Sequence, residues 1–357
     1  MNVIKINDTK IGDDFPCYTI AEAGANHDGN VNKALKLIDA AVKGKASSVK
    51  FQTYKASKLV TRNAPKYWDD GNPDETQFDV FQKLDSLSND DWKYIFEYAN
   101  EKKITCFSTP FDKDSVDLLY SLDVPAFKIA SADITNIPLI EHIAKKDLPI
   151  FISTGMASEQ ETSDAIDVIN DKGNHDIIIL HCITSYPTNP EDANLEMIRT
   201  LQNNFPKNII GFSDHTLGID IAIFSTFYGA KVIEKHFTFD NDLKTSPDHR
   251  LSLTPIEFEK MVKQIALTRI SRGSPNRTSF SSEMDAVKFA RRSIVSNFEI
   301  KENTVITENL LDIKRPGTGI APKYLNKIIG MKTIRDIPED TPLQWEDLTP
   351  LTEKNEN

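Results

Sequence analysis

Cysteine is scarce in this chain of 357 residues, which has only Cys17, Cys106 and Cys182. Each of the three lies within or beside an apolar, strand-like run, and their number is odd. This usage is typical of buried free thiols and excludes a disulfide framework as the source of stability. We therefore expect a reducing, cytoplasmic location.

Long hydrophobic runs and an excess of positive charge are also missing. No run approaches the roughly 18 apolar residues of a membrane span, and the N-terminus has no basic segment followed by an apolar one. The formal net charge is −11, which argues against nonspecific binding to nucleic acid or to an anionic membrane. We expect neither as a partner, although a local basic pocket remains compatible with this charge.

The chain has instead a regular alternation of apolar, strand-like runs and helical periods. Residues 3–12 predict a short hairpin, and eight strand-and-helix units follow it. The predicted strands are 18–22, 48–52, 104–109, 125–130, 149–154, 177–182, 209–213 and 231–236. The predicted helices are 31–44, 90–103, 112–122, 137–146, 159–172, 191–204, 218–228 and 255–270.

Runs of Val and Ile with helical periods on both sides predict a parallel sheet covered by helices. Eight such units favour a closed (β/α)8 TIM barrel. An open doubly wound sheet is the competing fold, but the segment Gly24–Gly29 lacks its dinucleotide fingerprint. The predicted catalytic barrel is therefore residues 1–272.

The pattern changes after the last helix. Residues 273–289 are polar and aperiodic and are interpreted as a linker. Residues 290–352 alternate short strand-like pieces with turns, which predicts a small mixed, mostly β domain. A core of that size is only marginally stable unless it docks on something. Residues 353–357 are interpreted as a disordered tail.

Polar side chains follow all eight predicted strands, and in a barrel these ends meet at one mouth. Lys50 and Lys128 each lie between apolar neighbours, which indicates that both point inward. The hydroxyl groups that would surround them are those of Thr109, Ser131, Ser153 and Ser213. Such a cationic, donor-rich cup suits phosphate and carboxylate oxygens.

Two histidines and two glutamates complete this set. His215 and His236 follow neighbouring strands and could hold a divalent metal. Glu22 and Glu234 could act as general acid or base, or could hold a sugar hydroxyl. A lone histidine is more often structural, and His181, between Leu180 and Cys182, is as well explained by core packing.

The order of these motifs resembles the sialic acid synthase family over nearly the whole chain. The matching segments are Ile20–Gly29, Val49–Thr53, Phe107–Phe111, Phe127–Ser131, Ile152–Met156, Leu180–Cys182, Ser185–Thr188, Gly211–Thr216, Val232–Thr238 and Ser246–His249. The C-terminal segment Lys314–Gly319 is similar to the family's antifreeze-like (SAF) domain. The resemblance implies condensation of phosphoenolpyruvate with an N-acetylmannosamine-type sugar, giving a nine-carbon 2-keto acid such as N-acetylneuraminate and releasing phosphate.

The resemblance also implies roles for individual residues. His215 and His236 match the metal ligands, most often for Mn²⁺, with Mg²⁺ or Co²⁺ as alternatives. The positions that match phosphoenolpyruvate contacts are Lys50, Thr109, Lys128, Ser131, Ser153 and Ser213, with Thr184 where many members have Asn. The positions that match contacts to the metal-bound water and the N-acylated amino sugar are Glu22, Gln52, Tyr186, Glu234 and Asp248. Arg315 matches an arginine that reaches the partner's barrel mouth in a domain-swapped homodimer.

Three alternatives remain open at this point. The acceptor could be a 2,4-diacetamido-2,4,6-trideoxy sugar, which would make the product a legionaminic- or pseudaminic-type acid. The loop with Asn72 and Gln77 is where that choice would be made. A metal-dependent aldolase or isomerase on the same barrel would release no phosphate from phosphoenolpyruvate. A non-enzymatic sugar-binding protein gives no reason for buried lysines beside paired histidines.

Overall fold

The computed structural model describes residues 3–68, 72, 74–243, 245–274, 276 and 280–351. The chain forms two compact units, Met1–Gly273 and Ser274–Asn357. The predicted tail, residues 353–357, lies outside the described residues. Within the part that the structure describes, no helix has the length and apolar character needed to cross a membrane.

The first unit contains a closed barrel of eight parallel strands, which confirms the predicted (β/α)8 fold. Strand β10 pairs with β3 and closes the ring, so that Val232 lies opposite Tyr18 and His236 opposite Glu22. The remaining strands follow in sequence order. Their bounds are β3 (Tyr18–Gly24), β4 (Ser48–Thr53), β5 (Thr105–Pro110), β6 (Phe127–Ile129), β7 (Ile150–Ser153), β8 (Ile177–Cys182), β9 (Ile209–Asp214) and β10 (Val232–His236).

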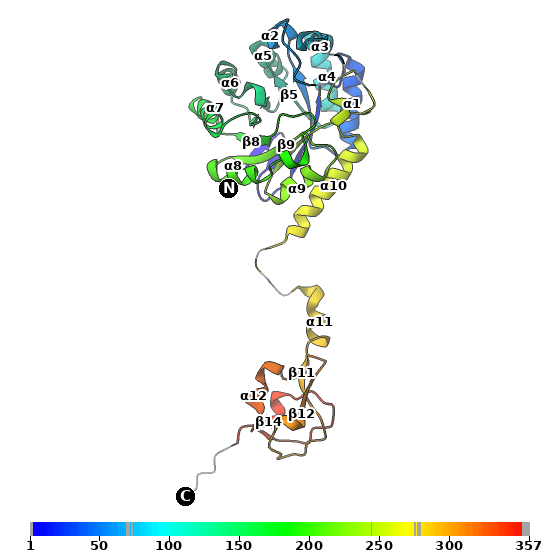
Figure 1. Cartoon of the computed structure of the whole chain (residues 1–357), viewed down its shortest axis with the longest axis vertical. Coiled ribbons are helices and arrows are strands. Elements are labelled where there is room, and N and C mark those ends of the chain that lie inside the picture. Colours follow the sequence, from blue (N-terminus) through cyan, green and yellow to red (C-terminus); the bar gives the residue numbers. More distant parts are fainter. Residues whose placement is uncertain are drawn as a thin grey trace. The chain divides into compact units, whose positions relative to one another are not determined.

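Eight main helices alternate with these strands and surround the barrel (Figure 1). They are α1 (Val31–Lys43), α4 (Asn89–Glu101), α5 (Lys113–Ser121), α6 (Ile137–Ala144), α7 (Glu159–Asp171), α8 (Glu196–Asn204), α9 (Asp220–Phe227) and α10 (Pro255–Arg272). Capping boxes start three of them, at Ser88, Ser158 and Thr254. In each box, a hydroxyl and an acidic side chain three residues later satisfy backbone N–H groups that the first turn leaves free.

The barrel strands separate two apolar cores because successive side chains point to opposite faces. The outward side chains pack against the helices, whereas the inward ones fill the barrel interior. The hairpin β1 (Ile4–Ile6) and β2 (Thr9–Ile11) contributes Ile4, Ile6 and Ile11 to the interior core. It therefore closes the end of the barrel at which the strands begin.

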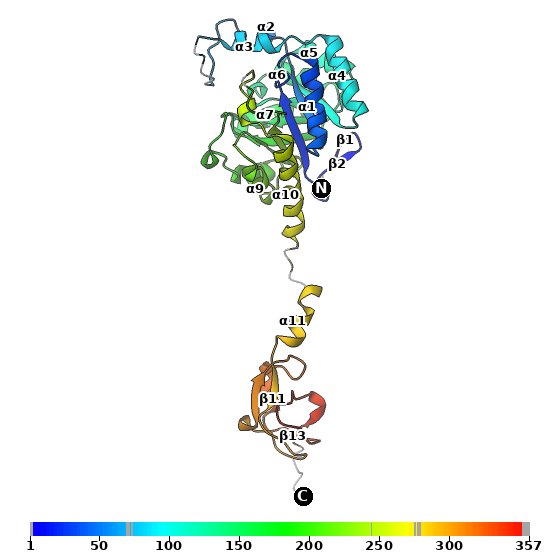
Figure 2. The ribbon, with the colours of Figure 1, turned by 90° about the vertical axis from the view of Figure 1, so that its right-hand side faces the viewer.

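The long connection after β4 contains two short helices, α2 (Ala56–Leu59) and α3 (Gln77–Leu84), which pack on each other. Both views of the ribbon show them at one end of the barrel, and Figure 2 shows the hairpin at the other end (Figures 1 and 2). This connection thus lies where the strands finish.

Among the described residues, the second unit has a small apolar core, two short strand pairs and three isolated bridges, in agreement with the predicted mostly β domain. Its elements are η4 (Ser281–Glu283), α11 (Met284–Phe289), β11 (Ser293–Ser296), β12 (Leu311–Lys314), α12 (Leu325–Ile328), β13 (Lys332–Thr333) and β14 (Leu348–Thr349). The second half of the predicted linker, residues 273–289, is therefore helical. The helix α11 has no buried face, which is why the sequence there shows no apolar period.

Candidate active site at the barrel mouth

A cavity of about 630 Å³ lies at the carboxyl ends of the barrel strands. It has the size of an ordinary small-molecule site. Its lining brings together 14 of the 15 residues that the sequence assigned to the site. They are Glu22, Lys50, Gln52, Thr109, Lys128, Ser131, Ser153, Thr184, Tyr186, Ser213, His215, Glu234, His236 and Asp248.

The two-residue period of the strands explains which side chains reach this cavity. On β4 the inward set is Ser48, Lys50 and Gln52, while Val49 and Phe51 pack outward against the helices. The interior core receives apolar residues from other strands, such as Phe107 of β5 and Phe151 of β7, and polar residues occupy the last inward layer. The layered filling of a TIM barrel thus builds a polar floor beneath the mouth.

The centre of this floor is a buried charge network. Lys50 Nζ lies 2.6 Å from Glu22 Oε2 and 3.5 Å from Glu234 Oε2, and it donates to Thr109 Oγ1 at 2.9 Å. Gln52 Nε2 donates to Glu22 Oε1 at 3.0 Å. All three charged groups are at most 5% exposed. Lys50 therefore keeps two carboxylates together in a site that excludes most water.

A second cation faces Glu234 from the other side. Lys128 Nζ lies 3.9 Å from Glu234 Oε1, and Ser213 Oγ donates to the same oxygen at 2.8 Å. Lys128 Nζ also donates to the carbonyl of Ile129. Burial lowers the pKa of Lys128, with the positive charge of Lys50 adding to the effect and Glu234 opposing it. Two lysines and a serine thus converge on one carboxylate.

The two glutamates have pKa values shifted in opposite directions. Burial raises the pKa of Glu22 to about 7; Lys50 opposes this shift and the negative charge of Glu234 adds to it. Burial also disfavours the charged form of Glu234, but Lys128 and Lys50 outweigh that effect and lower its pKa to about 2. Two carboxyl groups separated in this way can take different roles, one exchanging protons and the other remaining ionised.

The two histidines lie side by side, with ring centroids 5.2 Å apart, and Tyr186 packs on His215. His215 Nδ1 donates to the carbonyl of Ile183 at 2.8 Å, so its Nε2 keeps a lone pair. His236 Nδ1 is buried without a hydrogen-bond partner, and Asp248 Oδ2 is 3.7 Å from it. This pair can supply two imidazole ligands to a divalent metal.

Further protein ligands for a metal are not gathered around this pair. Among the described residues, no three His, Cys, Asp or Glu side chains are arranged to hold a metal ion. A metal held by the two histidines would therefore keep positions for water or substrate, as catalytic sites do. Next to the two histidines, Asp214 and Lys235 face outward and connect β9 with β10. Lys235 Nζ donates to Asp214 Oδ2 at 2.7 Å.

The opposite side of the cavity is formed by loops and is largely aromatic. Tyr54 packs edge-on against Phe81 and Phe111, and Trp68 is tilted against Phe81. With Leu59 these residues form the aromatic wall of the cavity. None of these residues carries a motif that assigned it to the site from the sequence. Tyr54 and Phe111 could have been found from the two-residue period of the strands. Tyr54 comes two residues after the inward-facing Gln52, and Phe111 comes two residues after the inward-facing Thr109.

Several lining atoms are buried without a hydrogen-bond partner among the described residues: Tyr54 Oη, Ser153 Oγ, Thr184 Oγ1 and His236 Nδ1. A buried polar atom without a partner costs free energy, on the order of 1–3 kcal/mol. Their gathering in one cavity indicates a site made to bind a ligand with several polar groups.

Gln77, from the loop where we placed acceptor choice, also lines the cavity, whereas Asn72 is not among its lining residues.

Two other residues singled out in the sequence are not among the residues that line this cavity. His181 faces outward from β8, donates Nε2–H to the carbonyl of Ala193 at 2.8 Å and stacks on Phe212. It is a structural histidine. Arg315 belongs to the second unit, directly after β12, and its side chain is exposed. Its predicted reach into a partner's barrel stays a prediction.

Family matches cover both units of the chain. Residues 37–277 match the NeuB family, and residues 291–349 match the SAF domain. The chain therefore belongs to the NeuB family and carries a C-terminal SAF domain, as the motif order indicated.

Named relatives place this family among the synthases of sialic acid and related nonulosonic acids. An N,N'-diacetyllegionaminic acid synthase of Legionella pneumophila is 38% identical over 96% of this chain and 98% of its own length. The N-acetylneuraminate-9-phosphate synthase of Homo sapiens is 32% identical over 94% of both chains. The crystal structure of an N-acetylneuraminic acid synthetase from Leptospira borgpetersenii, in complex with citrate, is 34% identical, with a TM-score of 0.72 over 80% of this chain and 95% of that one.

Proposed function

We propose that this protein condenses phosphoenolpyruvate with an unphosphorylated, N-acylated amino sugar to give a nine-carbon 2-keto acid and inorganic phosphate. The observation that carries the proposal is the pair Lys50 and Lys128 on either side of Glu234, ringed by hydroxyls at the barrel mouth. Membership of the NeuB family supports the same reaction class.

The strand-borne floor suits phosphoenolpyruvate, which carries a phosphate and a carboxylate. Lys50 and Lys128 supply two cations, and Ser131, Ser153 and Thr184 supply hydroxyl groups on the same side. Within the part of the chain that the structure describes, the Ser153 and Thr184 hydroxyls have no hydrogen-bond partner, so they are available to anionic oxygens. Fixed donors of this kind stabilise developing negative charge without reorganisation.

The reaction needs one new carbon–carbon bond and one proton carrier. The enol carbon of phosphoenolpyruvate bonds to the aldehyde carbon of the open-chain sugar, water adds to the phosphate-bearing carbon, and phosphate leaves by carbon–oxygen cleavage. With a pKa near 7, Glu22 is suited to take the proton from that water. Glu234 stays ionised and holds the two lysines in place.

A divalent metal, with Mn²⁺ as our first expectation, fits the histidine pair. His215 Nε2 and the ring of His236 would hold it, and both rings are buried. When bound there, the metal supplies a Lewis acid that polarises the sugar aldehyde. Asp248, beside His236, would face the acceptor's hydroxyl groups.

The aromatic wall favours an acceptor with methyl groups and without a phosphate. Among the described lining residues, Lys50 and Lys128 lie on strands, and the remaining Lys or Arg side chain is Arg250. Its guanidinium donates to the carbonyl of Tyr186. Apolar rings bind N-acyl methyl groups or a deoxy carbon well. Both N-acetylmannosamine and a 2,4-diacetamido-2,4,6-trideoxy sugar meet this description. We further propose that Arg315 completes the acceptor site in a domain-swapped homodimer.

Phosphate release from phosphoenolpyruvate, measured with Mn²⁺ across a panel of sugars, tests this function. The panel contains N-acetylmannosamine, its 6-phosphate and 2,4-diacetamido-2,4,6-trideoxymannose. We expect release with an unphosphorylated sugar, at least tenfold slower release with the 6-phosphate, and loss of activity on chelation that Mn²⁺ restores. A sugar product formed without phosphate release would indicate the aldolase or isomerase alternative instead.

A further inference from the structure

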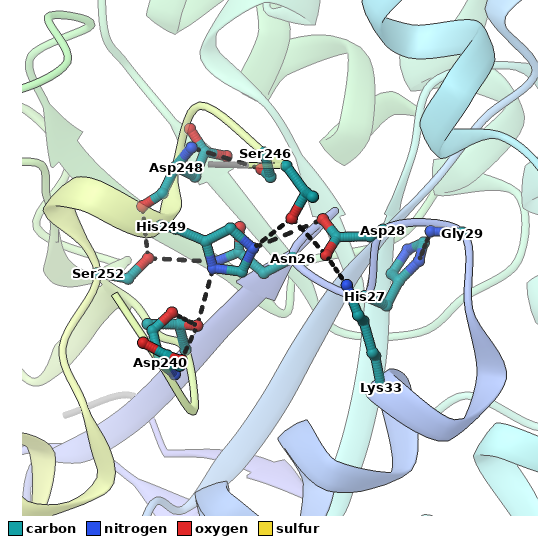
Figure 3. Close-up of polar contacts among 12 residues, drawn as sticks. Asn26, His27, Asp28, Gly29, Lys33, Asp240, Ser246, Asp248, His249 and Ser252 are labelled. Carbon is teal, nitrogen blue, oxygen red and sulfur yellow. Dashed lines mark hydrogen bonds and ion pairs between the residues drawn. The ribbon is translucent and has the colours of Figure 1, made fainter. Parts of the chain in front are cut away.

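Two loops at the barrel mouth are joined by a polar network whose residues Asn26 and His249 are buried (Figure 3). The β3–α1 loop, residues 25–30, contributes Asp28, and the β10–α10 loop, residues 237–254, contributes Thr245 and His249. Thr245 Oγ1 donates to Asp28 Oδ2 at 2.6 Å, and His249 Nε2 lies 3.5 Å from Asp28 Oδ1. These loops are more than 200 residues apart in sequence, so only the closure of the barrel by β3 and β10 brings them together.

The His249 ring is held from both of its nitrogens and is fully buried. Thr238 Oγ1 donates its single proton to the carbonyl of Asp240, so it accepts from His249 Nδ1 at 2.8 Å. On the other side, Nε2 faces Asp28 Oδ1 and a Thr245 hydroxyl whose proton is given to Asp28. Both ring nitrogens therefore face polar groups, Thr238 on one side and Asp28 with Thr245 on the other. The His249 ring thus connects Thr238 and Thr245 of its own loop to the Asp28 carboxylate of the other loop.

A second side chain from the same short loop secures the end of the β10–α10 loop. Asn26 Nδ2 donates to the carbonyl of Phe237 at 3.0 Å and to Ser252 Oγ at 3.2 Å. Ser252 Oγ in turn donates to the main-chain carbonyl of Asp248 at 2.6 Å. Asp248 is thus held through its neighbour His249 and through its own main-chain carbonyl, which accepts from Ser252.

Asp248 lines the cavity, together with Pro247 and Arg250 of the same loop. It precedes the short helix η3 (His249–Leu251), and its Oδ2 lies 3.7 Å from His236 Nδ1. Neither Asp28 nor His249 lines the cavity. Their contacts therefore act on the site through neighbouring residues of the loop, of which Asp248 carries the carboxylate.

We propose that Asp28 and His249 are positioning residues for the acceptor. Together they form a latch between the β3–α1 and β10–α10 loops that holds the Asp248 carboxylate toward the sugar. This inference rests on the proposed function for its kinetic consequence, but the latch itself is a structural claim that can be measured without any substrate.

The variants Asp28→Asn and His249→Gln test the latch. Asn tolerates the positive φ of Asp28, 51°, so the first variant removes the charge without backbone strain. We expect each to raise the KM for the sugar about tenfold while the KM for phosphoenolpyruvate changes less than twofold. The double variant should be no worse than the more damaging single variant, because both remove the same contact. A merely structural role would lower the active fraction, and hence kcat, without changing either KM.

Hydrogen exchange of the full-length protein gives the readout that does not depend on the reaction. Amides of residues 249–253 should exchange at least fivefold faster in Asp28→Asn than in the wild type. Asp39→Asn, which removes a surface contact of α1 with Tyr98 and Lys102, is the matched control and should change neither exchange nor KM. Unchanged exchange in Asp28→Asn overturns the latch. Faster exchange in a protein that releases no phosphate with any sugar supports the latch and refutes the proposed function.

Discussion

The two sides of the cavity are built in different ways. The floor comes from strand ends, and its charged residues, such as Lys50, Glu22 and Glu234, are 5% exposed or less. The aromatic wall comes from the long connection between β4 and α4 and, with Phe111, from the loop after β5; Tyr67 on this side is 67% exposed. Residues on strands of a closed barrel are fixed by the surrounding hydrogen-bonded ladder, whereas loop residues can be exchanged without disturbing it.

This difference separates chemistry from acceptor choice. The groups that would bind phosphoenolpyruvate and transfer protons lie on the floor, where the hydrogen-bonded strands of the barrel fix the positions of the side chains. The groups that would face the sugar lie on loops. A family that makes several related acids can therefore keep one floor and vary its wall. Changes on the floor should alter kcat, and changes on the wall should alter the KM of the sugar.

The largest effect is expected for Lys50→Met, which removes the cation between two buried carboxylates. Loss of this fixed charge should lower kcat/KM for phosphoenolpyruvate about 10³-fold, by analogy with the loss of preorganised donors elsewhere. The variant should also lose stability, by roughly 3–5 kcal/mol, because a buried charge loses its partner. Steady-state kinetics and thermal unfolding measure both effects.

Lys102→Met is the control for that experiment. Lys102 forms an ion pair with Asp39 on the surface, and such pairs contribute about 0–1 kcal/mol. Its kinetics should match the wild type. Wild-type kcat/KM in Lys50→Met would mean that the floor is structural and that the anion site lies elsewhere.

A medium effect is expected in the pH profile. Because Glu22 acts as a base in its ionised form, kcat should rise as the pH increases through about 7, the pKa to which burial raises this carboxyl group. Below that pH the protonated form accumulates and activity falls. Glu22→Gln should lower kcat about 100-fold and abolish the rise of kcat with pH. If the Gln variant keeps this rise, another group transfers the proton.

The smallest effect is expected for Tyr54→Phe on the wall. The Tyr54 hydroxyl is buried without a hydrogen-bond partner, so its removal should leave stability unchanged or slightly higher. If this hydroxyl bonds the sugar, its loss should raise the sugar's KM about five- to tenfold and leave kcat nearly constant. If Tyr54→Phe lowers kcat as much as Glu22→Gln does, the assignment of catalysis to the floor and of acceptor binding to the wall is wrong.

The sequence predicted the barrel because its signals are local. Val and Ile runs, capping residues such as Ser158, and a two-residue period need no distant partner to be recognised. The same period decides that Lys50 points inward and His181 outward. For this reason the fold and 14 cavity residues could be derived from residue order and family motifs alone.

Other features were decided only by the tertiary structure. The opposite pKa shifts of Glu22 and Glu234 depend on how far each lies from Lys128, which no spacing along the chain reveals. The aromatic wall and the contact of Asp28 with His249 join segments that carry no shared period. Closing β10 against β3 sets these distances, because ring closure converts separation in sequence into proximity in space.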